Sequence, residues 1–257
     1  MHAESTGTQR LRPPGGRASG PVRLVAIVPT LHDDAALAEL LSDLARLEAP
    51  PEQVIVVDGA SSEPPSALCH GENVRWLRSA VGRGVQLSAG VAAAKEALGE
   101  GPAAGTDVLW FLHADCRPDP RSAAVIRTVI GRGAAGGYFR FRFGGSGCPL
   151  KALLERCIAL RCRVGMVYCD QGIFVTRTAY EASPGIDPQP LFEEVPLIRH
   201  LKSTRRFVAL DLPITVSPRR WERDGFMRRT LHNRLLAVGY LLGMTPTRLA
   251  RWYRSAG

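Results

Sequence analysis

The sequence has no apolar stretch that is long enough to cross a membrane. The longest apolar runs, residues 24–29 and 235–244, are far shorter than the roughly 20 residues that a spanning helix needs. Residues 1–21 contain three arginines but no apolar run, so we expect no secretory signal there. Their content of proline, glycine and serine predicts a flexible leader instead. We therefore expect a cytoplasmic protein.

Closely paired cysteines are also lacking. No two cysteines form a CxxC pair, and their spacing matches no common zinc motif. We expect free thiols, most of them buried, in a reducing compartment. The six cysteines are Cys69, Cys116, Cys148, Cys157, Cys162 and Cys169.

Acidic residues are scarce near the C-terminus. Residues 199–257 contain thirteen lysines and arginines against three acids, a surplus of ten, whereas the whole chain has a net charge of +9. The rest of the chain is therefore close to neutral. Such a tail can bind anionic lipid, polyphosphate or nucleic acid, and a solvated basic face without a partner is the simpler alternative.

No glycine-rich turn follows residues 22–29, which we predict as the first strand. A dinucleotide-binding fold needs such a turn directly after that strand, which argues against a nicotinamide or flavin enzyme. A sugar nucleotidyltransferase is a second hypothesis, because it shares the sheet and the metal chemistry. It usually needs a glycine-rich loop with a basic residue at the same place, and that loop is absent.

The chain does contain what a large globular domain requires, with 45% hydrophobic and 22% charged residues. Strand and helix patterns alternate along the first half, which predicts an α/β fold with a mostly parallel sheet flanked by helices. The predicted strands are residues 22–29, 53–58, 73–78 and 107–112. The predicted helices begin at Asp33 or Asp34, and span residues 83–98 and 120–130.

The second half is less regular. We predict strands at 136–143 and 172–176, helices at 150–163 and 193–201, and a strand pair or one bent strand at 207–216. Residues 227–254 fit one or two amphipathic helices broken near Pro246. We therefore divide the chain into a leader (1–21), an α/β domain (22–226) and basic C-terminal helices (227–257) that pack on the domain or extend from it.

Polar side chains follow several predicted strands at their carboxyl ends, where open parallel sheets bind ligands. Asp58 ends the second strand, and His113 and Asp115 follow the fourth. One such aspartate caps a turn about as often as it binds a ligand, but two on neighbouring strands favour a site. Asp115 suits Mg or Mn, and His113 is a second ligand, a phosphate contact or simply a packed histidine.

Two further charged positions fit the same site. Arg83 lies between two glycines at a helix start, where backbone N–H groups and a guanidinium favour an anion; a surface arginine is the alternative. Glu193 and Glu194 open a predicted helix. Acids are favoured there by the helix dipole, and the functional alternative is a general base.

Four segments together resemble the family 2 glycosyltransferases of the GT-A fold. They are VIVVDGAS at 54–61, GRGVQ at 82–86, FLHAD at 111–115 and FEEV at 192–195. The similarity covers roughly residues 22–230. It is greatest to a bacterial subgroup of short, soluble members whose genes lie near radical-SAM and selenium or arsenosugar genes.

The resemblance implies an inverting, metal-dependent enzyme that uses a nucleotide-diphosphate sugar, with a leaning to UDP and with Mn or Mg as the cofactor. The residues implied on the donor side are Thr30, Asp33, Asp58, Arg83, Arg220 and Trp221. Asp115, with His113, is implied at the metal. Glu194 is implied as the catalytic base with Glu193 beside it, and Asp170 and Gln171 on the acceptor side.

Two positions depart from the family pattern. His-Ala-Asp at 113–115 replaces the usual acidic pair at the metal, which leaves the metal's identity open. Glu194 replaces the usual aspartate, so a longer side chain must reach the acceptor.

A third hypothesis is a noncatalytic module that binds RNA or membrane through the basic tail. Aromatic residues alternate with arginines there, as in stacking or interfacial surfaces. This reading leaves the strand-end acids unexplained. We expect no nucleic acid partner, and we keep a peripheral contact with the inner face of an anionic membrane as an additional expectation.

Overall fold

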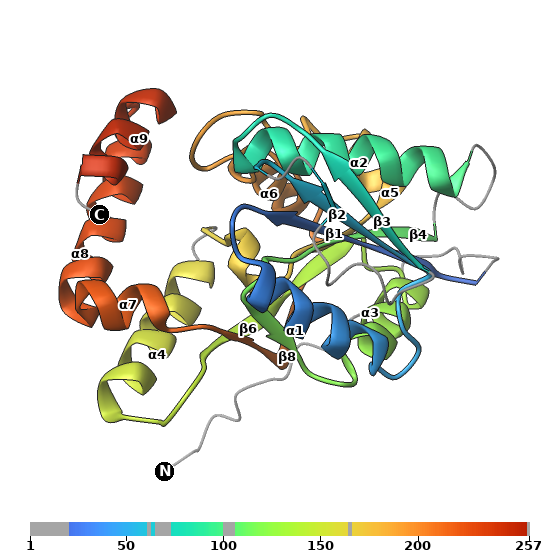
Figure 1. Ribbon diagram of the computed structural model, residues 1–257, viewed down its shortest axis with the longest axis horizontal. Helices are drawn as coiled ribbons and strands as arrows, with labels where there is room; N and C mark the ends of the chain where they lie inside the picture. The colour runs from blue at the N-terminus through green and yellow to red at the C-terminus, as the bar shows by residue number, and fades with distance from the viewer. Residues whose placement is uncertain (1–20, 61–62, 65–72, 100–105, 164–165, 256–257) are drawn as a thin grey trace, which may run out of the picture.

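The computed structural model describes residues 21–60, 63–64, 73–99, 106–163 and 166–255 (Figure 1). The predicted leader, apart from residue 21, and Cys69 lie outside these ranges. The five remaining cysteines are free thiols, and Cys116, Cys162 and Cys169 are buried.

The first half of the chain forms the parallel part of one eight-stranded sheet in the order β3-β2-β1-β4-β7-β6-β8-β5. The parallel strands are β1 (Arg23–Thr30), β2 (Gln53–Asp58), β3 (Val74–Arg78) and β4 (Asp107–Phe111). The helices of this half are α1 (Asp34–Ala45), α2 (Arg83–Leu98) and α3 (Ser122–Gly131). The predicted alternation of strands and helices is confirmed.

The second half adds mixed pairing to the sheet. Its strands are β5 (Cys116–Pro118), β6 (Gly136–Phe143), β7 (Phe174–Thr176) and β8 (Phe207–Val216). β6 and β8 pair in parallel, whereas β4 with β7, β6 with β7 and β5 with β8 are antiparallel. β8 is a single strand whose register to β6 shifts once, which decides between the two predicted forms. The three-residue strand β5 was not predicted, because it is too short to show a period.

Both faces of the sheet are covered, which explains why its central strands are continuous apolar runs. Alternate residues of β1 point to opposite sides: Leu24 packs toward α1, and Ile27 packs toward α2. In Figure 1, α1 and α3 lie on one side of the sheet, and α2, α5 (Arg177–Glu181) and α6 (Val195–Ser203) lie on the other. α2 approaches β1 closely, because a Cβ on Gly90 would lie 2.4 Å from a methyl of Ile27.

The C-terminal helices form a column beside the sheet, next to α4 (Pro149–Arg163) (Figure 1). They are α7 (Arg219–Asp224), α8 (Phe226–Leu241) and α9 (Pro246–Ser255). The predicted break near Pro246 is confirmed, and α7 is an additional short helix. A small apolar cluster that contains Phe192, Leu236 and Leu249 packs these helices on the domain. Arg219 also bonds Asp33 at 2.7 Å, which joins α7 to the end of β1.

Candidate active site

The carboxyl ends of three neighbouring strands form one edge of the site. Thr30 pairs in register with Asp58, and β4, which precedes His113, lies on the other side of β1. Gln86 joins this edge to α2, because its buried amide donates to the carbonyls of Thr30 at 2.7 Å and Val57 at 2.8 Å. The start of α2 is therefore fixed against the strand ends.

The start of α2 also contacts the segment that leads to the two glutamates. Arg83 donates a hydrogen bond to the carboxylate of Glu193. A Cβ on Gly84 would lie 2.4 Å from the carbonyl oxygen of Asp187, so only glycine permits this approach. The glycine of the predicted anion-binding motif thus serves close packing, and Arg83 points at Glu193.

The backbone before the glutamates is strained. Phe192 has a φ of 60°, a left-handed conformation that costs a non-glycine residue about 1–3 kcal/mol. Its ring packs on Tyr168 and on Tyr240 of α8, with centroids 5.9 Å and 4.6 Å away. Tertiary packing by α8 therefore holds the turn from which the glutamates project. Glu194 is the residue that precedes α6, which begins at Val195, two residues later than predicted.

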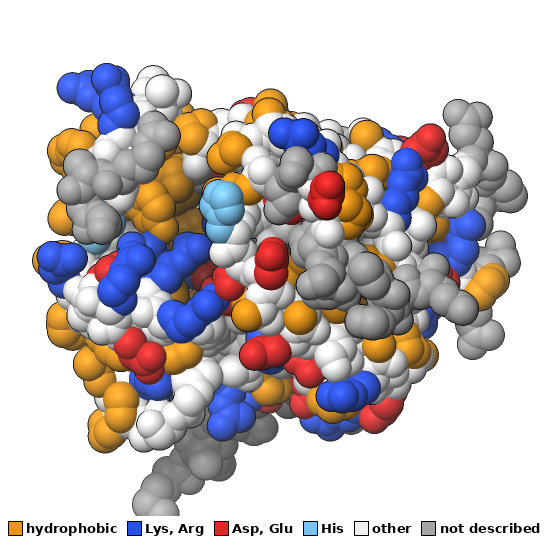
Figure 2. Space-filling model, in the orientation of Figure 1, with side chains coloured by type: hydrophobic (Ala, Val, Ile, Leu, Met, Phe, Trp, Pro, Cys, Tyr) orange, Lys and Arg blue, Asp and Glu red, His pale blue; other side chains and the backbone are white. Residues whose placement is uncertain are grey.

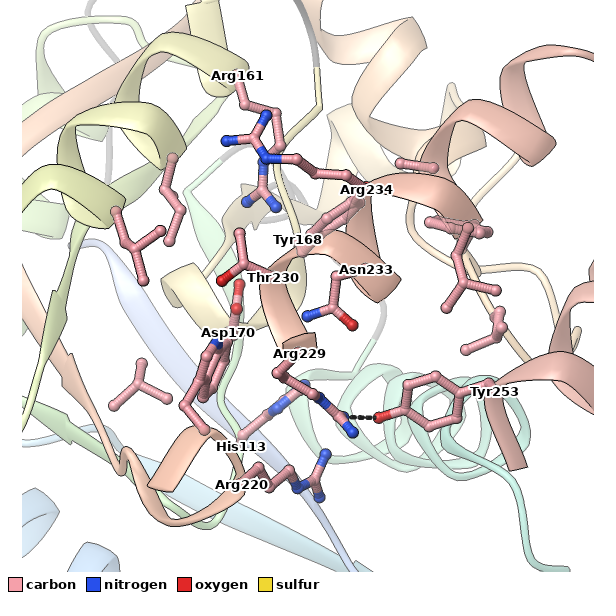
Figure 3. Close-up of a pocket in the computed structure, with 18 of the residues that line it drawn as sticks. His113, Arg161, Tyr168, Asp170, Arg220, Arg229, Thr230, Asn233, Arg234 and Tyr253 are labelled. Atoms are coloured by element: carbon pink, nitrogen blue, oxygen red, sulfur yellow. Dashed lines mark hydrogen bonds between the residues drawn. The ribbon is translucent and has the colours of Figure 1, made fainter. Parts of the chain in front are cut away.

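A pocket opens between this edge and the C-terminal helices (Figure 3). Figure 2 shows Lys and Arg side chains gathered over α7 and the start of α8, beside a hollow. The pocket brings together seven of the predicted site residues from five parts of the chain: Arg83, His113, Asp115, Asp170, Glu194, Arg220 and Trp221. Three of the seven are arginine or histidine, and three are acids. The seventh, Trp221, is an aromatic wall that packs on Phe143.

The two glutamates have different environments. Glu193 is fully buried and ion-paired to Arg83, whereas Glu194 is 1% exposed at the pocket wall. The Oε2 atom of each has no hydrogen-bond partner. Burial raises the pKa of Glu194 to about 8, and the charge of Glu193 adds to this shift. A carboxyl group with a raised pKa in a pocket is typical of a proton acceptor or donor.

Three donor groups in the pocket suit a divalent cation. Burial, followed by Arg83 and Arg220, lowers the pKa of His113 well below its ordinary value, so its imidazole is neutral at pH 7. Its Nε2 and the Oδ1 of Asp170 are buried without a hydrogen-bond partner. Burial raises the pKa of Asp170, and nearby Asp115 adds to that shift. A cation between such groups would relieve the repulsion.

These groups do not enclose an ion by themselves. Within the described part of the chain, no three His, Cys, Asp or Glu side chains are grouped so that they could hold a metal. Mg and Mn sites in nucleotide enzymes commonly combine one or two carboxylates with phosphate oxygens of the ligand. The residues present fit that kind of shared site.

Several predicted residues lie outside the pocket lining. Thr30 and Asp58 are buried at the neighbouring strand ends, and Asp58 accepts a hydrogen bond from the amide of Ala60 at 2.8 Å. Asp33 bonds Arg219 on the rim. Gln171 is 1% exposed, and its amide donates to the carbonyl of Phe139 at 3.3 Å, so it faces the protein interior. Asp170, its neighbour, reaches the pocket.

The far wall of the pocket contains no residue that was predicted as part of the site. This wall comes from α4, the segment before η3 (Cys169–Gln171), α8 and α9, and its polar members are Arg161, Tyr168, Arg229, Thr230, Asn233, Arg234 and Tyr253 (Figure 3). The members on α8 recur at helical spacing, which is a signal in the sequence. The spacing alone does not say that this face covers a pocket.

Residues 25–150 match a protein family described as glycosyl transferase family 2. Residues 1–349 of S. aureus TarS, in complex with UDP-GlcNAc, share the fold at 15% identity and a TM-score of 0.55, over 76% of this chain and 58% of that one. Glucosyl-3-phosphoglycerate synthase from Mycobacterium tuberculosis (GpgS), in complex with Mn²⁺, UDP-glucose and phosphoglyceric acid, shares it at 18% identity and a TM-score of 0.53, over 74% and 70%.

The chain thus spans less than two thirds of the TarS chain. No curated protein matches the sequence. The GT-A fold predicted from the four segments is confirmed by the family match and by these structures.

We expect the free energy of unfolding to fall as the pH rises from about 4.5 to about 8, the ordinary and the raised pKa of Glu194. In this range the folded state keeps a proton that the unfolded state has lost, so the stabilisation is complete below 4.5 and disappears through 8. Urea unfolding measured across this pH range should show a smaller decline in the free energy of unfolding for Glu194→Gln, because glutamine cannot titrate. Exposed Glu63→Gln should keep the wild-type decline. An unchanged decline in Glu194→Gln would contradict the raised pKa.

Proposed function

Because the chain is a glycosyltransferase of family 2, we propose that it transfers a sugar from a UDP-sugar to an acceptor nucleophile, with inversion at the anomeric carbon and with a divalent metal. One observation supports this best. Arg83, Asp115, Glu194 and Arg220, which are far apart in sequence, line a single pocket at the carboxyl ends of the strands. Cations for a diphosphate and a carboxyl group for proton transfer are thereby placed around one space.

In the proposed reaction Glu194 accepts the proton of the acceptor nucleophile. The acceptor forms a bond to the anomeric carbon as the bond from that carbon to the diphosphate oxygen breaks, and UDP leaves with the electron pair. Attack from the face opposite the leaving group inverts the configuration. The carboxylate form that this step needs increases as the pH rises toward about 8.

The leaving diphosphate carries charge that the pocket can balance. Arg83 and Arg220 line the pocket, and both act on His113, which supports their being close to each other. Asp115, with His113, would hold Mg or Mn together with the diphosphate, and the metal would stabilise the charge of the leaving group. GpgS in complex with Mn²⁺ and UDP-glucose has the same fold.

The nucleoside part of the donor is placed at the strand ends next to the pocket. Thr30 and Asp58 lie side by side there, and Asp33 is bonded to Arg219, one residue before Arg220. This arrangement supports the roles that the resemblance implies for these three residues. UDP-GlcNAc in TarS and UDP-glucose in GpgS favour a UDP-sugar as the donor.

The two alternatives from the sequence lose support. The family match favours sugar transfer over sugar activation by a nucleotidyltransferase. A purely noncatalytic module leaves the buried carboxyl groups of the pocket without a role. The basic tail instead contributes the wall of the pocket, through Arg229 and Arg234.

We also propose that the outer face of α8 contacts an anionic membrane surface. Met227, Leu231, Leu235, Val238 and Leu241 recur every three or four residues, and each is more than half exposed. Arg229, Asn233 and Leu236, which line the pocket, lie on the opposite side of the helix.

Charge favours lipid as the partner of this face. Arg228 on α8 and Arg248 and Arg251 on α9 are exposed, and Trp252 is 54% exposed. Apolar residues with arginines and a tryptophan at one surface are typical of interfacial helices. No helix in the described ranges has the length and apolar content that a membrane crossing requires.

Glu194→Gln should keep UDP binding and lose about 10²–10⁴-fold in turnover, because a general base typically contributes that much. Turnover is measured as UDP released from UDP-glucose and UDP-GlcNAc, with water and a panel of hydroxyl acceptors. Glu63→Gln is the matched control and should behave as wild type. Wild-type turnover in Glu194→Gln would refute the assignment of the base.

Asp115→Ala should remove the Mn-dependent part of UDP binding. Isothermal titration with and without Mn should show at least about a tenfold gain in UDP affinity in the wild type, roughly 1.4 kcal/mol, and no gain in the variant. Asp211→Ala removes a carboxylate that is 96% exposed and should keep the gain. A preserved Mn effect in Asp115→Ala would place the metal elsewhere.

Cosedimentation should show binding to phosphatidylglycerol vesicles and little binding to phosphatidylcholine vesicles. The double variant Leu231→Glu with Leu235→Glu should lose at least about tenfold in binding, because two charges enter the apolar face. Val81 is 64% exposed and precedes α2, so Val81→Glu should bind vesicles as the wild type does. A wild type that dimerises through this face, with monomeric glutamate variants and no vesicle binding, would mean that a second copy covers it.

A further inference from the structure

We propose that the acceptor carries an anionic group, a phosphate or a carboxylate, which binds between Arg161 of α4 and Arg234 of α8. This inference rests on the proposed function, because it names the class of molecule that receives the sugar. Both arginines line the pocket that contains Glu194. Neither is needed for the contacts that hold the strand ends and α2 together.

Arg161 is fixed in place and still has an unused donor. Its guanidinium lies over the ring of Tyr168, 4.1 Å from the centroid, and Nη2 donates to Oε1 of Gln171 at 3.4 Å. The same oxygen accepts from Cys162 at 3.1 Å, and the Gln171 amide is anchored on Phe139. The Nε of Arg161 is buried without a hydrogen-bond partner. A buried unsatisfied donor on a preorganised guanidinium suits an incoming anion.

Arg234 approaches the same place from the opposite wall. Figure 3 shows its guanidinium pointing toward that of Arg161, with the hydroxyl of Thr230 below them. In the described part of the chain neither arginine makes an ion pair. Two guanidinium groups that face each other repel, and an anion between them turns the repulsion into two charge-assisted hydrogen bonds.

The pair lies at a distance from the proposed diphosphate site. In Figure 3 Arg161 and Arg234 occupy one end of the pocket and His113 and Arg220 the other, with Asp170 between them. An anion at the first end is therefore a second ligand rather than part of the donor.

The wall beside Arg161 faces the proposed base. Tyr168 packs on Phe192, two residues before Glu194, with ring centroids 5.9 Å apart, and all three residues line the pocket. The Tyr168 hydroxyl is buried without a hydrogen-bond partner. An acceptor held by its anionic group at Arg161 would have its nucleophile directed toward Glu194.

Binding of inorganic phosphate tests the site directly. Isothermal titration of phosphate into protein saturated with UDP and Mn should show binding in the wild type and at least about tenfold weaker binding in Arg161→Gln and in Arg234→Gln. Arg156→Gln on α4 changes an exposed arginine outside the pocket and should bind as wild type. Equal phosphate binding in all variants, or none in the wild type, would overturn the inference.

Turnover supplies a second readout. UDP release from the donor should be at least about tenfold faster with glycerophosphate than with glycerol, and this preference should vanish in Arg161→Gln with Arg234→Gln. Arg161→Lys should retain part of it, which guards against a variant that merely misfolds. A wild type that prefers glycerol would also overturn the inference.

The outcomes separate this inference from the proposed function. If the protein binds UDP in a Mn-dependent way and slowly releases UDP from the donor, but does not bind phosphate, only the anionic acceptor is refuted. If UDP does not bind, the proposed function fails, whatever phosphate does. UDP release with glycerophosphate and with vesicles containing phosphatidic acid, each compared between the wild type and Arg161→Gln with Arg234→Gln, shows whether the anion belongs to a soluble acceptor or to a lipid.

Discussion

The ion pair between Arg83 and Glu193 is the contact on which the arrangement of the site depends. It joins residues 110 positions apart, at the start of α2 and before α6, and its carboxylate is fully buried. Adjacent buried carboxylates repel each other strongly unless a cation compensates one of them. Arg83 compensates Glu193, whereas burial and the charge of Glu193 raise the pKa of the neighbouring Glu194 at the pocket wall, an increase that Arg83 partly offsets. Two glutamates next to each other in sequence thus acquire different chemistry.

Much of the fold could be predicted because the physical signals were local. Central strands such as β1 and β2 are buried on both faces, so they are continuous apolar runs, and Gly and Pro mark the ends of several helices. The ends of these strands could therefore be predicted as well. That prediction placed Asp58, His113 and Asp115 at the same edge of the sheet. The antiparallel pairing of β7 could not be predicted, because three residues show no period and their partners are distant in sequence.

The part of the site that is built from residues at element ends could be predicted from the sequence. The part that is built from the faces of α4 and α8 could not. Arg83, Asp115 and Glu194 belong to motifs at element ends, and they do share a pocket. Gln171 illustrates the limit, because a sequence cannot show that its amide turns inward to Phe139 while Asp170 turns outward. Arg161 and Arg234 illustrate it again: each resembles an ordinary helix arginine until tertiary packing places α4 opposite α8.

The stacking of Phe192 on Tyr240 has a consequence for how such an enzyme can diversify. Tyr240 of α8 supports the turn that presents Glu193 and Glu194, and Thr230 and Arg234 of the same helix shape the end of the cavity away from the proposed donor site. Substitutions in this helix therefore fall into separate groups by their position along its axis, because Tyr240 lies near its C-terminal end. Under the proposed function, some would disturb the geometry around Glu194, whereas others would change which acceptors are glycosylated and leave the proposed nucleotide site intact.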